Sequence, residues 1–334
     1  MAEDSNMTTD MMEGNATTPA INITSKNSRL HCNQLYDHYQ PNQFTIPLYG
    51  FVAPILLIVT VIANTMVVIV LSQTNMRNAS NTILLAISLS DSMTMLVSTP
   101  YFFYMYTLSN YKHPLESPLL CYLWTYTTDI IPTLFHTTSI WLTLVLAAQR
   151  YVHICRTPIA ALWCNKKNVI LISIAMLLLS TLHQGARFFE NYYVVDRNED
   201  GSMLGCMSCK SKWLHVIGED IYYHVYFWSR VIVIHLGPCL VLVVLNVLLY
   251  RKMQQALLTR RRLMQGSIKN KESRSSHEKH HTTLMLIVIV SIFLVTEFPL
   301  AVITLLHILH ASQLMDFLYY EKSQCNLYLT YLAT

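Results

Sequence analysis

The chain has 334 residues, of which 53% are hydrophobic and 13% are charged, and its formal net charge is +4. Soluble domains carry about 25% charged residues, so this composition excludes an ordinary soluble domain and indicates a membrane protein with several spans. The basic run at 260–262 lies between two apolar segments. We therefore interpret it as a cytoplasmic anchor beside the lipid bilayer and exclude nucleic acid as a partner.

Six apolar segments are long enough to cross a bilayer, which takes about 20 mostly apolar residues. We expect these spans at 47–71, 81–107, 119–152, 169–188, 222–250 and 281–309. In the last segment, 316–334, the apolar-leaning run after Lys322 is too short for a full crossing, so a seventh helix would be cut off near its outer half. The expected fold is an all-α, polytopic transmembrane bundle (46–334) that follows a polar tail (1–45).

The placement of charge predicts the orientation of the bundle. Nine basic residues lie from Arg251 to Lys279, whereas the loop after the fourth span is rich in acids. Basic loops stay in the cytoplasm, so we expect a multi-pass plasma-membrane protein with its N-terminus outside the cell. Three sequons lie in the tail, and we expect glycosylation at Asn6, Asn15 and Asn22.

Polar side chains inside membrane spans indicate ligand or ion pathways. Asp129, Thr133 and His136 recur at spacings of four and three residues, so they share one face of the third helix. Arg230 and Glu297 lie in the fifth and sixth spans. We expect these five groups to bind a ligand between the helices. Alternatively, Arg230 pairs internally with Glu297 or Asp129, and a ligand could rearrange that pair.

Other functions find little support in the sequence. A proton pump or transporter built on acids in the spans would show duplicated halves with broken helices, and no internal repeat is visible. The chain contains no His-Glu-x-x-His, Gly-x-Ser-x-Gly or glycine-rich phosphate motif. We therefore expect no enzymatic activity.

Several motifs together resemble those of rhodopsin-like (class A) G-protein-coupled receptors. They are Asn64 in the first span, Ser88–Asp91 in the second, Gln149–Tyr151 in the third, Pro238 in the fifth, and Phe293 with Glu297–Pro299 in the sixth. Longer runs are similar to the invertebrate sex peptide/myoinhibitory peptide receptors, at 46–50, 101–106, 131–144, 213–223 and 235–239. The resemblance implies a bundle of the seven-helix receptor type.

The resemblance also implies a neuropeptide receptor for short amidated peptides with tryptophans, coupled to a heterotrimeric G protein. The switch toward the G protein would consist of Arg150, Tyr151, Phe293 and Pro299. Gln149 stands where the family has an acid beside the arginine, which suggests a weak inactive-state lock. Because the seventh helix would be incomplete, the alternative is a non-signalling variant that acts as a decoy or modulator.

In the same family, a buried aspartate of the second helix belongs to a sodium site. Here the corresponding groups are Asp91, Ser139 and Asn64, whose oxygen and amide groups suit a hard cation. Sodium is the only cofactor that we expect.

The resemblance pairs Cys121 with Cys206, and the spacing to Trp213 favours Cys206 over Cys209. Cys32, Cys209 and Cys325 then remain on the outer side and cannot all pair. A Cys32–Cys325 bridge is one option.

Overall fold

The computed structural model describes residues 32–34, 41, 43–74, 78–113, 115–155, 165–197 and 203–264, with 291, 295, 297–299, 301–302 and 305–306. Within this part of the chain, five helical segments are long and apolar enough to cross a membrane: Ile46–Ser72, Ala79–Thr107, Pro118–His153, Lys166–Phe189 and Glu219–Lys252. They match the first five predicted spans and confirm the helical class. The sixth span is described only at scattered positions, and the predicted start of a seventh lies outside the described residues.

Each span is built from one or more helical elements. The first contains η2 (Ile46–Val52) and α2 (Ala53–Ser72), and the second α3 (Ala79–Phe102) and η4 (Phe103–Thr107), after which η5 (Asn110–Lys112) forms a short turn. The third contains α4 (Pro118–Thr125), η6 (Tyr126–Ile130) and α5 (Ile131–Cys155). The fourth contains α7 (Lys166–Gln184) and η7 (Gly185–Phe189). After α8 (Lys212–Ile217), the fifth contains α9 (Glu219–Ser229), η8 (Arg230–Leu236) and α10 (Gly237–Met264).

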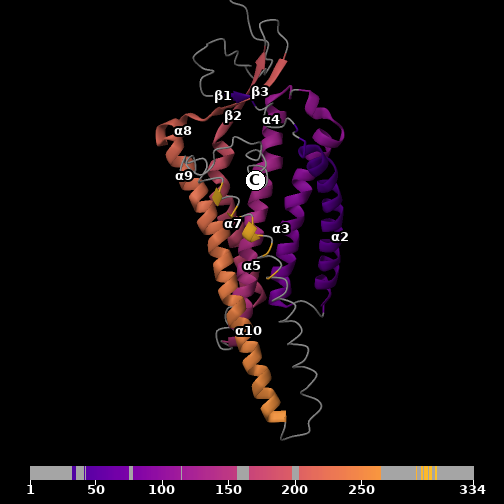
Figure 1. The fold of residues 1–334 in the computed structure, drawn as a ribbon, viewed down its shortest axis with the longest axis vertical. Coiled ribbons are helices and arrows are strands. Elements are labelled where there is room, and N and C mark those ends of the chain that lie inside the picture. Colours follow the sequence, from indigo (N-terminus) through magenta and orange to yellow (C-terminus); the bar gives the residue numbers. More distant parts are fainter. Residues whose placement is uncertain are drawn as a thin grey trace, which may run out of the picture.

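The third span is the centre of the bundle. In the apolar stretch of this span 67% of the residues are buried, whereas none are buried in the apolar stretch of the first span. Figure 1 shows α5 among α3, α7 and α10, while α2 lies at one side and α10 extends beyond the other helices. The outer surfaces expose large apolar side chains such as Ile55 and Leu182, as expected of helices that face lipid.

Side-chain caps define where several helices begin. Asn78 and Asn165 each accept a hydrogen bond at 2.8 Å from the backbone N–H three residues later. Ser117 caps α4 in the same way and is followed by Pro118, whose fixed φ suits the first helical position. These caps satisfy backbone donors that would otherwise lack partners at a helix start.

A π-helical turn interrupts the fifth span at η8, and the sequence explains it. Pro238 has no N–H to donate to the preceding turn, and Gly237 donates instead to the carbonyl of Ile232, five residues back. A Cβ atom on residue 237 would lie 2.5 Å from that carbonyl oxygen, so only glycine fits. The wide turn contains Arg230 and His235, both of which are buried.

A small antiparallel sheet covers one end of the bundle, which we call the sheet end. It contains β1 (Cys32–Gln34), β2 (Asn191–Arg197) and β3 (Met203–Lys210) in the order β1-β3-β2. The sequence predicted no strands, and residues 1–45 were expected to form a polar tail. The strands β2 and β3 form a hairpin, and β1, which belongs to that tail, pairs with β3. Disulfides hold these short strands in place.

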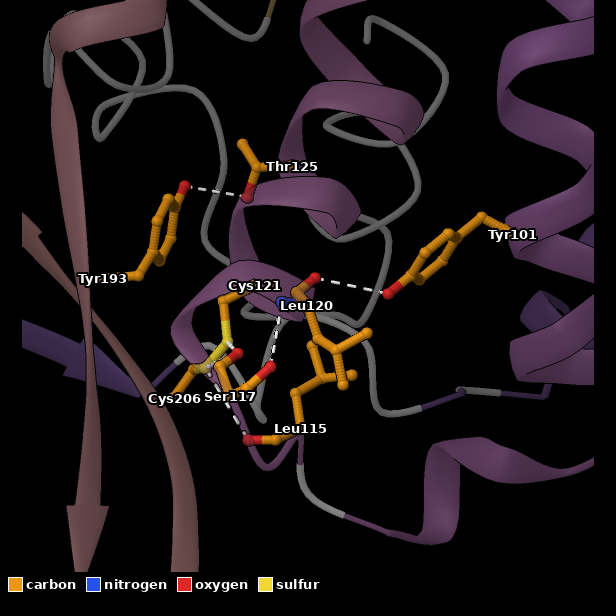
Figure 2. Close-up of a disulfide and its surroundings, with 8 residues drawn as sticks. All are labelled: Tyr101, Leu115, Ser117, Leu120, Cys121, Thr125, Tyr193 and Cys206. Carbon is orange, nitrogen blue, oxygen red and sulfur yellow. Dashed lines mark hydrogen bonds between the residues drawn. A yellow bond between two sulfur atoms is a disulfide. The ribbon is translucent and has the colours of Figure 1, made fainter. Parts of the chain in front are cut away.

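Two disulfides hold β3. Figure 2 shows Cys206 bonded to Cys121 of α4, which is the pair that the resemblance implies. The second bond joins Cys32 to Cys209 and corrects the option of a Cys32–Cys325 bridge. The physical reason is the strand register, which places Cys32 directly opposite Cys209. Cys325 lies outside the described residues.

Removal of the Cys32–Cys209 bond should destabilise the sheet end. The bond joins residues 177 positions apart, and loss of a native disulfide costs about 2–5 kcal/mol. We expect the double variant Cys32→Ser/Cys209→Ser to lower the midpoint of thermal unfolding of the purified protein in detergent. Cys239→Ala, at a buried free cysteine, is the control and should lower it less. Equal midpoints for the double variant and the wild type would contradict this prediction.

Candidate functional site

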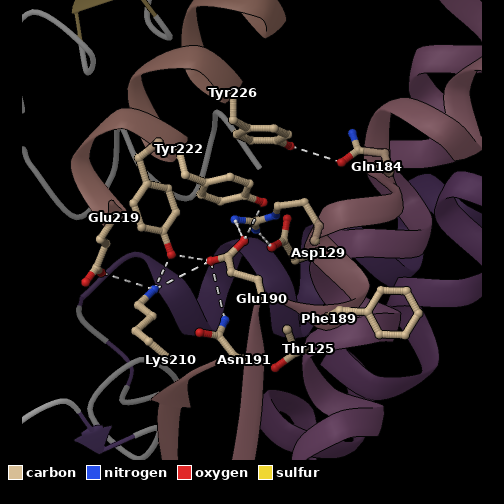
Figure 3. Close-up of polar contacts among 12 residues, drawn as sticks. Thr125, Asp129, Gln184, Phe189, Glu190, Asn191, Lys210, Glu219, Tyr222 and Tyr226 are labelled. Atoms are coloured by element: carbon tan, nitrogen blue, oxygen red, sulfur yellow. Dashed lines mark hydrogen bonds and ion pairs between the residues drawn. The ribbon is translucent and has the colours of Figure 1, made fainter. Parts of the chain in front are cut away.

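A buried carboxylate, Glu190, holds the sheet end together (Figure 3). Its side chain is 3% exposed and lies between the end of the fourth span and the start of β2. Its polar neighbours come from the fourth span, both hairpin strands and the fifth span: Arg187, Asn191, Lys210, Tyr222 and Tyr223. In addition, the Ser211 N–H donates to the Glu190 carbonyl at 2.9 Å. One residue therefore joins three separate segments.

Arg187 extends this cluster to the third span. Its guanidinium donates to Glu190 at 3.1 Å and also forms an ion pair with Asp129 of η6. The same group lies 5.3 Å from the ring centre of Tyr226, whose hydroxyl donates to Gln184 at 3.0 Å. The structure thus pairs Asp129 with Arg187, which sequence reasoning had not considered as a partner.

Sequence reasoning did not single out Arg187 or Glu190. Both stand at the end of an apolar span, where a charged residue is ordinarily interpreted as the beginning of a solvated loop. The structure buries them because the hairpin folds back over the bundle. The pair Arg187–Glu190, three residues apart on a helix end, was the available signal.

A second polar cluster lies deeper in the bundle, around Glu297 of the sixth span. Oε1 of this carboxylate lies 3.3 Å from Nε2 of His136, and Oε2 lies 3.3 Å from Nδ1 of His235. Glu297 is 5% exposed and His235 is 1% exposed. Arg230 is also buried, and its charge acts on both Glu297 and His235. The carboxylate thereby connects the third, fifth and sixth spans.

The five predicted ligand residues are divided between two levels. Asp129 belongs to the sheet-end cluster, whereas His136, Arg230 and Glu297 belong to the deeper one. Asp129 and His136 are seven residues apart, about 10 Å along a helix. Thr133 is buried between these two levels. His235, which sequence reasoning did not select, completes the deeper cluster.

Two of the three predicted sodium ligands contact each other. Ser139 donates a hydrogen bond of 2.6 Å to Asp91, which links α5 to α3. These two oxygen groups fit a hard cation. Among the described residues, no hydrogen bond joins the half-buried Asn64 to either of them. Sodium binding therefore stays a prediction.

The residues of the predicted switch lie toward the opposite end of the bundle. Gln149 is buried and accepts a hydrogen bond of 3.0 Å from Ser80 at the start of α3. Arg150 and Tyr151 are half-buried beside it, and Pro299 is exposed on a helical turn of the sixth span. Phe293 and the sequons at Asn6, Asn15 and Asn22 lie outside the described residues.

One tyrosine of the hairpin fixes β2 to the third span. Tyr193 is 7% exposed and donates a hydrogen bond of 2.7 Å to Thr125 (Figure 2). Burial raises the pKa of the Tyr193 phenol to about 12, so the hydroxyl keeps its proton at physiological pH. Its ring also packs edge-on against Tyr122.

Comparison with protein families gives one match over most of the chain. The family model for serpentine type 7TM GPCR chemoreceptors of the Srw class covers residues 51–334. This stretch includes all the elements from α2 to α10 and both polar clusters.

Three curated proteins are similar to the chain. The sex peptide receptor of Drosophila melanogaster is 40% identical over 294 residues, which are 87% of this chain and 67% of the relative. The sex peptide receptor-related protein 2 of Caenorhabditis elegans is 31% identical over 79% of this chain, which spans 60% of that relative. The FMRFamide receptor of Drosophila melanogaster is 24% identical over 76% of this chain and 50% of its own length.

We predict that Glu190→Gln destabilises the protein by about 3–5 kcal/mol, because it removes the buried charge that Arg187 and Lys210 share. Thermal unfolding of the purified protein in detergent measures this effect. Glu219→Gln is the matched control, since its side chain is 41% exposed and lies 3.9 Å from Lys210. Such an exposed pair contributes about 1 kcal/mol or less. Equal effects of the two substitutions would show that Glu190 is not the central link.

Proposed function

Because the chain belongs to the serpentine seven-transmembrane G-protein-coupled receptor family, we propose that it is a neuropeptide receptor for short amidated, myoinhibitory-like peptides. The observation that carries the proposal is the 40% identity with the sex peptide receptor over 294 residues. Members of this family are multi-pass membrane receptors and not enzymes. Another relative, the FMRFamide receptor, is named after an amidated peptide.

In this proposal the chain lies in the plasma membrane, with its N-terminus and the sheet end outside the cell. The peptide approaches beside the hairpin and inserts between the third, fifth and sixth spans. It then contacts Thr133 and His136 of the third span, Arg230 of the fifth and Glu297 of the sixth. The burial of Thr133, Arg230 and Glu297 supports the proposal, since polar and ionisable side chains inside a membrane indicate ligand pathways. Asp129 lies at the outer level, where Arg187 already neutralises it.

Signalling follows from a change in helix packing. A ligand that prefers one of two bundle conformations shifts the population toward it. The sixth span would swing outward about Pro299 and expose Arg150 to a heterotrimeric G protein. Gln149 supports this mechanism, because it is bound to Ser80 by a neutral hydrogen bond, which is weaker than a charge-assisted one. The inactive conformation would thus be only weakly stabilised at the end of the bundle that contains Arg150.

The first test is binding of a fluorescent, amidated peptide with spaced tryptophans to intact cells that display the chain. An N-terminal tag confirms display at the surface. We expect saturable binding that an unlabelled amidated peptide displaces. Absence of binding despite normal display would refute the proposed function.

A second test separates binding from coupling. Arg150 lies far from both polar clusters, so Arg150→Ala should leave peptide affinity within about threefold of wild type. The same substitution should reduce peptide-stimulated nucleotide exchange on the G protein by at least about tenfold, because it removes the switch group. An equal loss of binding and coupling would count against this role.

A further inference from the structure

We propose that Glu297, held between His136 and His235, distinguishes an amidated peptide end from a free carboxylate. This inference rests on the proposed function, because it assigns the ligand chemistry of the same site. It concerns a departure from the resembled motif, which has tryptophan where this chain has Glu297.

The two histidines hold the Glu297 carboxylate in place but do not occupy all of its hydrogen-bond acceptor positions. Each oxygen of Glu297 has one imidazole nitrogen at 3.3 Å. A carboxylate has about four acceptor positions, so at least one on each oxygen can still receive an N–H. His235 also has an unused hydrogen-bonding atom, since its buried Nε2 atom has no hydrogen-bond partner within the described part of the chain. Both residues therefore have hydrogen-bonding capacity left for a further polar group.

The sheet-end carboxylate offers no such capacity. Glu190 already has five polar neighbours around two oxygens, and its side chain is 3% exposed. Asp129, the other acid at that level, is paired with Arg187. The deeper cluster is therefore the better candidate for contacting a peptide end.

The chemistry of the deeper cluster matches a primary amide. The NH₂ group of the amide can donate to the Glu297 carboxylate, which has acceptor positions left. A free carboxylate has only acceptors and carries a negative charge. Placed next to buried Glu297, it would be repelled strongly, because the low dielectric of the interior weakens screening.

One member of the cluster is only partly buried. The side chain of His136 is 33% exposed, whereas that of Glu297 is 6% exposed and that of His235 is 1% exposed. The cluster can therefore be approached from the His136 side. A chain end is small enough to fit beside one imidazole, which favours the peptide terminus over a bulky side chain.

The experiment compares three forms of one tryptophan-containing peptide: amide, methyl ester and free acid. On the wild-type receptor we expect the amide to bind on the order of 100-fold more tightly than the acid, because like charges at a desolvated contact repel. The methyl ester, which is neutral but has no N–H to donate, should lie between them. Glu297→Gln should reduce the amide-to-acid ratio to less than about tenfold, mainly because the acid binds more tightly.

Two further variants make the result specific. Glu219→Gln makes the same chemical change at the sheet end and should keep the wild-type ratio. Glu297→Met is uncharged, similar in length and more apolar, so it provides the same comparison if the glutamine variant is not displayed at the surface. The assignment to Glu297 would be overturned if the wild type bound amide and acid with equal affinity. It would also be overturned if both uncharged variants kept the wild-type amide-to-acid ratio. In either case, binding of the amide to wild type would still support the proposed function.

Discussion

The buried carboxylate of Glu190 determines how the sheet end is assembled. A negative charge in such a place costs several kcal/mol unless donors surround it, and this one gathers donors from the fourth span, the hairpin and the fifth span. Through Arg187 it also reaches Asp129 of the third span. The positions of the hairpin and of three membrane helices thus depend on a single ionised group. The disulfide at Cys206 adds a covalent connection to the third span.

The third span connects the polar groups of the bundle at four levels. From the sheet end downward, it contributes Asp129 to one cluster, His136 to another, Ser139 to the bond with Asp91, and Gln149 to the bond with Ser80. These contacts join the third span to the fourth span at Asp129, to the sixth span at His136, and twice to the second span, at Ser139 and Gln149. A central helix with such contacts is well placed to transmit a change at one level to the others, since it packs against most of the bundle.

The sequence predicted those features that depend on composition along one segment. Five spans were found because apolar length is a local property, and His136 and Glu297 stood out because polar groups are costly in a membrane. The partners were harder to predict. Arg187 and Glu190 resemble ordinary residues at a helix end until the hairpin covers them. His235 required the wide turn before Pro238, and the Cys32–Cys209 bond required a strand register that no local pattern specifies.

The bond at Cys32 also restricts the segment that precedes it. Once β1 is fixed to β3, any group attached at Asn22 is only ten residues from a fixed point. Ten residues span at most about 35 Å when fully extended. A group at that position can therefore lie no farther than this from the Cys32–Cys209 bond. The disulfide thus sets an upper limit on the distance between the sheet end and anything attached at Asn22.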